Sequence, residues 1–166
     1  MMARGTPHAI SLNVARRVLE GSDDKDCIAY SSDTKVDIDR YRRYLFADMS
    51  VVCGPPELTE GRNDVIKNPV LIIEVLSPST EGYDRGMKFK MYRSLPSLRE
   101  YVLIAQDEPL VEVFFRQNDT RWSYQIYAGV EAQVALLSIE RTISLAHIYQ
   151  KVAFSAPTQE AATAAS

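Results

Sequence analysis

Hydrophobic and polar residues alternate along the chain in patterns that change from helical to extended. In the first such segment, HAISLNVARRVLEG, Ile10, Val14 and Val18 recur at helical spacing, which predicts a helix between Pro7 and Gly21. Residues 27–38, CIAYSSDTKVDI, alternate at their ends and predict a strand.

Two further extended segments each contain one carboxylate. Residues 45–53, LFADMSVVC, predict a second strand with Asp48 near its centre. Residues 70–76, VLIIEVL, form an apolar, β-branched run that predicts a third strand buried on both faces, with Glu74 inside it. A polar turn, SPST, follows this strand, and a helix is expected over residues 83–94.

The helix over residues 83–94 carries Met87, Met91 and Leu95 as one apolar row. Strands are expected next at residues 100–105, 110–116 and 122–127, the last two as an antiparallel pair around QNDT; a short apolar piece at 134–137 and a helix at 142–152 then follow. This order predicts an α/β fold: a mixed sheet with a helix on each side.

Composition narrows the class of protein. The chain has 166 residues, 46% of them hydrophobic, and a net charge of −3, which fits one globular domain, expected at residues 6–154, with a disordered tail at 155–166. No apolar run approaches the length that spans a bilayer and the N-terminus has no signal-peptide core, so no membrane association and a cytoplasmic location are expected. The two cysteines, Cys27 and Cys53, form no CxxC or Cys/His cluster, so neither a zinc site nor a disulfide scaffold is expected.

Asp48 and Glu74 are the first candidates for chemistry. A carboxylate inside an apolar strand is costly unless a partner compensates it. If the two strands pair, both side chains can converge at one sheet edge, where a divalent cation would relieve their repulsion, and hard oxygen ligands favour Mg²⁺ or Mn²⁺. The alternative is that each carboxylate lies at a strand end and accepts a hydrogen bond from a loop.

The helix after the Glu74 strand supplies a possible cation. Asp84, Lys88 and Tyr92 follow one another at four-residue spacing and therefore share one helix face. From the first turns of this helix, the Lys88 ammonium could reach the end of the strand, orient a water molecule and stabilise charge on a phosphate. The alternative is a surface ion pair between Asp84 and Lys88.

One basic segment of the chain suggests DNA as a ligand. Arginines and tyrosines alternate before the Asp48 strand, and this cluster suits contacts to a DNA backbone, although a solvated hairpin tip would give the same pattern. The candidate DNA-binding residues are Arg40, Arg42, Arg43 and Lys90. Neither GxGxxG nor GxxxxGK[ST] occurs, so no nucleotide cofactor is expected.

Four segments together resemble a known family. LFADMSVVC, NPVLIIEVLSPST, YDRGMKFKMYRSL and REYVLIA are similar to the corresponding blocks of the Uma2 family of endonucleases, and the most specific part is EVLSPST followed by D-R-G-x-K-x-x-x-Y. The resemblance covers residues 6–150. It implies the restriction-endonuclease-like fold of the PD-(D/E)XK superfamily and a Mg²⁺-dependent DNA endonuclease.

The resemblance also implies roles for individual residues. Asp48 and Glu74 match the acidic residues of the PD and (D/E)XK elements, and the Val75 carbonyl becomes a further possible metal ligand. Leu76 stands where the superfamily usually has lysine, and Lys88 on the next helix takes that place. Three more residues match family positions of supporting function: Asp84, Tyr92 and Glu100.

The chain departs from the family pattern in three places. Ala47 stands where proline is usual, and Ala105-Gln106 where many relatives have aspartate. The matching region also begins late, so an additional N-terminal helix and hairpin strand are expected to be missing. A catalytically inactive DNA-binding or protein-interaction module is therefore the alternative to an endonuclease. A homodimer is expected by analogy with the family, because duplex cleavage by nucleases of this fold commonly uses two active sites.

Overall fold

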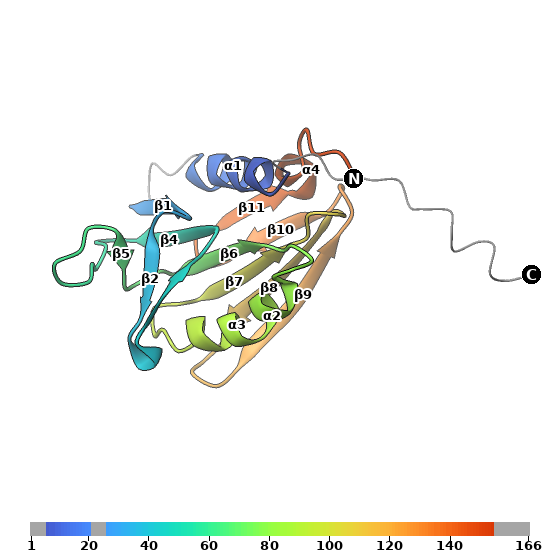
Figure 1. Ribbon diagram of the computed structural model, residues 1–166. Coiled ribbons are helices and arrows are strands. Elements are labelled where there is room, and N and C mark those ends of the chain that lie inside the picture. The colour runs from blue at the N-terminus through green and yellow to red at the C-terminus, as the bar shows by residue number, and fades with distance from the viewer. Residues whose placement is uncertain (1–5, 21–25, 155–166) are drawn as a thin grey trace, which may run out of the picture.

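Six strands form the central sheet of the computed structural model, which describes residues 6–20 and 26–154. Their order is β1-β4-β6-β7-β8-β9; β6 and β7 run parallel, and all other neighbours are antiparallel (Figure 1). The strands are β1 (Cys27–Ser31), β4 (Met49–Cys53), β6 (Leu71–Val75), β7 (Glu100–Ile104), β8 (Leu110–Arg116) and β9 (Trp122–Ala128). The predicted mixed sheet is confirmed.

Helices cover both faces of this sheet. The first helix, α1 (Thr6–Leu19), packs on one face beside α4 (Leu145–Ile148), whereas α2 (Glu81–Arg85) and α3 (Met87–Tyr92) lie on the other (Figure 1). The predicted α/β sandwich is therefore confirmed.

Two smaller sheets flank the large one. The first has the order β3-β2-β5, with β2 (Lys35–Ile38), β3 (Arg43–Phe46) and β5 (Val65–Ile66), and a 3₁₀ turn, η2 (Asp39–Tyr41), joins β2 to β3. The second is the hairpin of β10 (Gln133–Leu136) and β11 (Arg141–Ser144).

The strands predicted at 27–38 and 45–53 were wrong as continuous elements. After Ser31 the chain turns, with the Thr34 amide donating to the Ser31 carbonyl at 3.1 Å, and leaves the large sheet. It forms the β2–β3 hairpin in the small sheet and returns at Met49. Asp48 therefore lies in the connection between two sheets instead of at the centre of one strand.

The helix predicted at 83–94 is also interrupted. Gly86 adopts φ −103° and ψ −94°, which separates α2 from α3. A Cβ at this position would lie 3.2 Å from the Gly82 carbonyl oxygen, so the close approach favours glycine. Met91 and Leu95 are buried as predicted, whereas Met87, the first residue of α3, is 52% exposed.

The helix predicted at 142–152 is shorter than expected. Residues 141–144 instead pair with 133–136 as a hairpin, and only 145–148 are α-helical. The Ser144 side chain accepts a hydrogen bond from the His147 amide at 3.3 Å and so caps this helix. Short apolar runs fit either periodicity, which explains the error. The tail predicted at 155–166 lies outside the described residues.

The large sheet separates two hydrophobic cores. On β6, Leu71, Ile73 and Val75 face the core under α1, whereas Ile72 faces the core under α3. Glu74, with the same parity as Ile72, lies on the α3 side and is only 2% exposed.

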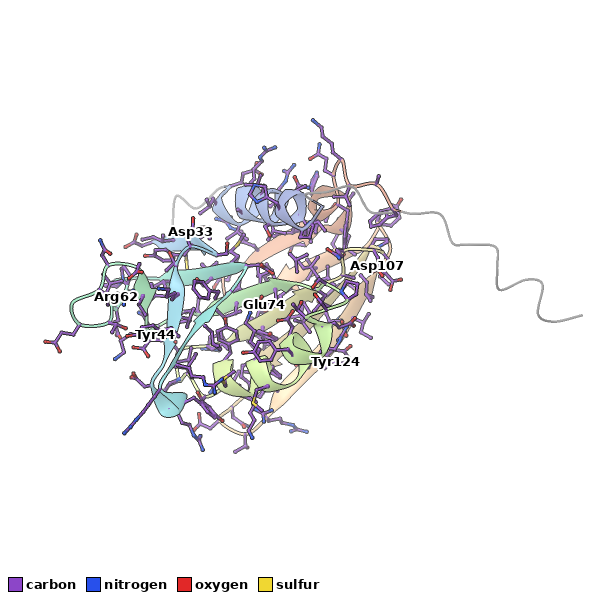
Figure 2. All side chains as sticks on the ribbon, viewed as in Figure 1. Asp33, Tyr44, Arg62, Glu74, Asp107 and Tyr124 are labelled. Atoms are coloured by element: carbon purple, nitrogen blue, oxygen red, sulfur yellow. A yellow bond between two sulfur atoms is a disulfide. The ribbon has the colours of Figure 1, made fainter. Side chains whose placement is uncertain are left out.

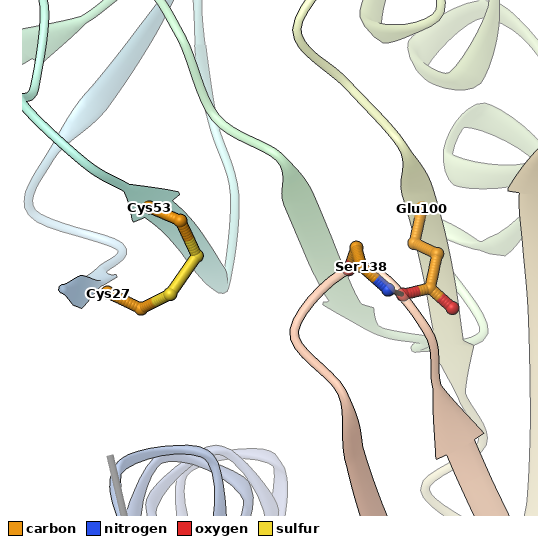
Figure 3. Close-up of a disulfide and its surroundings, with 4 residues drawn as sticks. All are labelled: Cys27, Cys53, Glu100 and Ser138. Carbon is orange, nitrogen blue, oxygen red and sulfur yellow. Dashed lines mark hydrogen bonds between the residues drawn. A yellow bond between two sulfur atoms is a disulfide. The ribbon is translucent and has the colours of Figure 1, made fainter. Parts of the chain in front are cut away.

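A disulfide joins Cys27 to Cys53, contrary to the expectation of free cysteines (Figure 3). The two residues are separated by 26 positions, but they are direct partners in the β1–β4 register, with Cα atoms 4.0 Å apart. Spacing in the sequence could not reveal a pairing that depends on the register. Among the described residues, no helix is long and apolar enough to cross a membrane.

Candidate active site

Asp48 and Glu74 meet at the edge where β4 and β6 diverge. The last pair in this register is Met49 with Ile73, so Asp48 and Glu74 lie one step beyond it, opposite each other. The Asp48 Oδ2 atom accepts a hydrogen bond of 2.6 Å from the Val75 amide. This bond fixes the Asp48 carboxylate to the end of β6, at the centre of the molecule where Figure 2 labels Glu74.

Glu74 is a buried carboxylate with one cationic partner. The Lys88 ammonium lies 2.9 Å from Oε1, and the Tyr92 hydroxyl donates to the same oxygen at 3.5 Å. Burial raises the pKa of Glu74 to about 8; Lys88 lowers it and Asp48 raises it further. The pKa is therefore high enough for the carboxyl group to change protonation state near neutral pH.

Lys88 joins three parts of the structure. It is 9% exposed, and its Nζ atom donates to the Phe46 carbonyl at 2.6 Å as well as to Glu74. The Asp84 Oδ1 atom is further away, at 3.7 Å. The structure thus places Lys88 at the end of the Glu74 strand, and Asp84–Lys88 is a buried contact instead of a surface pair.

Asp84 and two tyrosines complete the surroundings of Lys88. Asp84 is 3% exposed, and burial raises its pKa. The Tyr101 hydroxyl donates to the Asp84 carbonyl at 2.8 Å and so holds α2 against the sheet. Burial also raises the pKa of both Tyr92 and Tyr101, so both hydroxyls stay protonated. Sequence reasoning missed Tyr101, which carries no signal beyond its place in a strand.

Glu100 does not belong to this site, contrary to the family correspondence. It shares its parity on β7 with Val102 and Ile104, which face the core under α1. Its carboxylate accepts a hydrogen bond from the Ser138 amide at 2.7 Å (Figure 3) and another from the Leu137 amide at 3.1 Å. Glu100 thus fastens the turn of the β10–β11 hairpin to the central sheet.

The carboxylate oxygens available as metal ligands at this site fit a cation that keeps several of its water ligands. Across residues 6–20 and 26–154, no group of three or more His, Cys, Asp or Glu could enclose a metal ion. Asp48 and Glu74 nevertheless each use one oxygen in the bonds above, Oδ2 and Oε1, which leaves Asp48 Oδ1 and Glu74 Oε2. Two carboxylate oxygens plus water are the usual protein contribution to Mg²⁺ binding, and a cation would relieve the repulsion between these carboxylates.

The candidate DNA-binding residues divide between two hollows. Arg40 and Lys90 line one of about 420 Å³ between the β2–β3 turn and α3, together with Arg93 and Trp122. A second, of about 400 Å³, contains Arg43 and Lys88, among others. Arg42 lines neither hollow; it ends η2 in the left-handed conformation, with φ 52°.

A third and larger hollow reaches Asp48 from the other side. It has about 530 Å³ and lies between α1 and β1, and His8, Asp33 and Met49 also line it. The site is therefore open to solvent on the Asp48 side as well as on the Lys88 side. Sequence reasoning did not identify Asp33.

Comparisons with known proteins concern the family and the fold of this chain. The family model Uma2, described as "Putative restriction endonuclease", matches residues 1–146. Two uncharacterized proteins of Synechocystis sp. are similar: slr1290 is 32% identical over 87% of this chain and 75% of its own length, and sll1609 is 30% identical over 80% and 75%. A crystal structure from Anabaena variabilis, described as a "putative nuclease belonging to DUF820", superposes with a TM-score of 0.70 at 17% identity, covering 90% of this chain and 83% of the other. This similarity shows a shared fold.

Proposed function

The chain belongs to the Uma2 family, and we propose on that basis that it is a metal-dependent nuclease that hydrolyses phosphodiester bonds in DNA. One observation carries the proposal: the Lys88 ammonium lies 2.9 Å from Glu74, directly beside Asp48. A lysine next to two carboxylates at the ends of neighbouring strands has the charges that phosphodiester hydrolysis requires.

Asp48 and Glu74 would hold a Mg²⁺ or Mn²⁺ ion, with the Val75 carbonyl as a third protein ligand. When bound, the ion supplies polarisation of a phosphoryl oxygen and lowers the pKa of a coordinated water. Glu74 must be ionised to take part, and its pKa of about 8 without metal means that cation binding displaces a proton near neutral pH.

Lys88 would orient the reacting groups. Its ammonium has three protons, of which two are directed to the Phe46 carbonyl and to Glu74. The third can reach the attacking water or a phosphate oxygen, since Asp84 lies beyond ordinary hydrogen-bond distance at 3.7 Å. Lys88 thereby stabilises the negative charge that develops on the phosphate.

Cleavage of plasmid DNA tests this proposal. We expect nicking with Mg²⁺ or Mn²⁺, none with EDTA, and losses of at least about a hundredfold in Asp48→Asn, Glu74→Gln and Lys88→Met. Lys151→Met is the matched control, because it removes the same charge from an exposed position near the C-terminal end of the described fold. Nicking that survives all three substitutions would exclude the assignment.

A second function, an inactive DNA-binding module, is favoured by one observation. Both carboxylates already have partners inside the protein, the Val75 amide for Asp48 and Lys88 for Glu74, so the site is stable without a cation. Calorimetric titration with Mn²⁺ distinguishes the two functions. Heat of binding that disappears in Asp48→Asn supports the nuclease, whereas DNA binding without any Mn²⁺ binding supports the module.

We also propose a cytoplasmic location, where the DNA substrate is found. The structure joins Cys27 to Cys53 by a disulfide, which a reducing cytoplasm would convert to two thiols. Rapid alkylation in intact cells, followed by mass spectrometry of the peptides, measures the thiol fraction. A fully oxidised pair would count against this location.

Cleavage of both strands of a duplex would require two active sites, and we propose a homodimer for that reason. Analytical ultracentrifugation with and without a short duplex tests the assembly. A monomer under both conditions that still makes double-strand breaks would contradict it.

A further inference from the structure

Three aromatic side chains surround the mouth of the site on the Lys88 side. Phe46 is 53% exposed, Tyr83 44% and Tyr44 43%. They line the hollow of about 400 Å³ that also contains Arg43 and Lys88. Single exposed apolar residues are common on protein surfaces, but three aromatic rings gathered around one lysine form a patch.

The fold alone does not require aromatic rings at these positions. On β3, Leu45 is buried in the core, whereas Tyr44 and Phe46 on the opposite side of the strand face outward. Polar residues at these two outward positions would satisfy the small sheet equally well. The rings therefore suggest binding of a ligand that has flat apolar surfaces.

Phe46 is connected directly to the proposed catalytic centre. Its main-chain carbonyl accepts the 2.6 Å hydrogen bond from Lys88. This bond holds the main chain of Phe46 beside the lysine, one residue from the buried Ala47 and two from Asp48. A group stacked on Phe46 would lie beside the reacting phosphate.

Cations accompany the rings. The Lys35 ammonium lies 5.6 Å from the centroid of Phe46, and the Arg62 guanidinium 5.8 Å from that of Tyr44; Figure 2 shows the latter pair at one end of the molecule. Lys35 and Arg62 are both paired with Asp64. In the part of the chain that the structure describes, no carboxylate lies within ion-pair distance of the following arginines: Arg40, Arg42 and Arg43.

We propose that this surface binds an unpaired nucleic-acid strand, with bases stacked on Phe46 and Tyr83 and the adjoining phosphate at Lys88. The inference rests on the proposed nuclease function and specifies that the strand to be cleaved is unpaired where it meets the site, as in a single strand or a locally melted stretch of plasmid. In a duplex the base faces are already stacked on one another and cannot reach these rings, whereas an unpaired strand exposes them. Unpaired arginines beside aromatic rings are the usual combination for binding such a strand, and binding of this kind tolerates any sequence.

Fluorescence anisotropy with a labelled oligothymidylate, in EDTA to prevent cleavage, tests the proposal. We expect the single strand to bind at least about tenfold more tightly than the oligo(dA)·oligo(dT) duplex at the same salt concentration. Phe46→Leu keeps the apolar volume but removes the ring, and should weaken binding about tenfold, whereas Phe46→Tyr should bind like the wild type.

Leu137→Ala is the control, because Leu137 is 59% exposed and lies beside the distant β10–β11 hairpin. Thermal unfolding confirms that each variant folds. Tighter binding of the duplex, undiminished binding by Phe46→Leu, or no binding of either probe would each overturn the proposal, and the last two would assign the rings to a protein partner or a second copy.

The binding and cleavage experiments together distinguish failure of the stacking surface from failure of the proposed nuclease function. If oligothymidylate binds as expected but neither Mg²⁺ nor Mn²⁺ supports cleavage, the stacking surface stands and the nuclease function falls. If plasmid is nicked but Phe46→Leu binds the single strand normally, the nuclease function stands and the stacking surface falls.

Discussion

Glu74 and Glu100 have similar neighbours in the sequence but lie on opposite faces of the central sheet. Each is a carboxylate in an apolar strand, on the neighbouring strands β6 and β7, and each is buried with a pKa raised mainly by burial. They differ in which face of the sheet they enter: Glu74 lies under α3, and Glu100 lies on the side of α1 and the β10–β11 hairpin.

The groups that contact the two carboxylates differ in kind. Glu100 accepts hydrogen bonds from two main-chain amides, which cannot titrate and do not attract a cation. Glu74 shares its surroundings with a lysine and with the carboxylates of Asp48 and Asp84, which raise its pKa. A buried carboxylate whose charge is satisfied by main-chain donors is structural, whereas one placed among other ionisable groups is a candidate for chemistry.

The largest expected effect separates the two residues by activity. Glu74→Gln should lower the rate of plasmid cleavage by about a thousandfold, because it removes a charged ligand from the proposed metal site. Glu100→Gln should lower it by less than about threefold. Initial nicking rates with Mn²⁺ measure both, and an equal loss in the two variants would remove the distinction.

Substitution of Glu100 should lower the stability of the fold more than substitution of Glu74 does. Glu100→Ala removes the acceptor for the amides of Leu137 and Ser138 and should lower the free energy of unfolding by about 2–3 kcal/mol. Glu74→Gln should change it by less than about 1 kcal/mol at pH 5, where the raised pKa keeps Glu74 protonated and therefore similar to glutamine. Urea unfolding measures both values; a stable Glu100→Ala would show that the hairpin turn does not need this carboxylate.

The pH dependence of the free energy of unfolding tests the protonation state of Glu74. Folding raises the pKa of Glu74 from 4.5 to about 8, so the folded state binds more protons than the unfolded state between these values. The metal-free protein should therefore lose stability relative to Glu74→Gln as the pH rises from 4.5 to 8, by up to about 5 kcal/mol, and no further above 8. Urea unfolding along this pH range in EDTA gives the difference curve, and a flat curve would mean that Glu74 ionises normally.

The smallest effect concerns the tyrosine hydroxyls. Tyr92 donates to Glu74 at 3.5 Å, the outer limit of a hydrogen bond, so Tyr92→Phe should change the cleavage rate by less than about threefold. Tyr101→Phe removes a bond of 2.8 Å to the Asp84 carbonyl and should cost about 1 kcal/mol of stability. A large rate loss in Tyr92→Phe would make this hydroxyl part of the catalytic centre.

Much of the fold was predictable because long β-branched runs dictate strands. The third strand was predicted within one residue at each end, at 70–76 against Leu71–Val75, and the helices on both sides followed from periodicity. The breaks at Asp48 and Gly86 were not predictable. Alternation continues through the crossing between sheets, and the glycine between α2 and α3 interrupts a pattern that otherwise reads as one helix.

The proximity of Asp48, Glu74 and Lys88 was predicted from the pairing of two strands and the reach of one helix. The position of Glu100 was not predicted, because alternation along a strand identifies two faces but does not show which of them contains the candidate site. The Cys27–Cys53 pair depended in the same way on a register that only the folded chain defines.

The hydrogen bond from Lys88 to the Phe46 carbonyl has a consequence for how relatives are interpreted. It ties the small sheet to the helical layer, so loss of the lysine would loosen β3 as well as alter the chemistry. A relative without the proposed nuclease activity would still benefit from retaining this side chain. The presence of the lysine in a related protein is therefore weak evidence that the protein is an active enzyme, and the carboxylates of Asp48 and Glu74 are the better indicator.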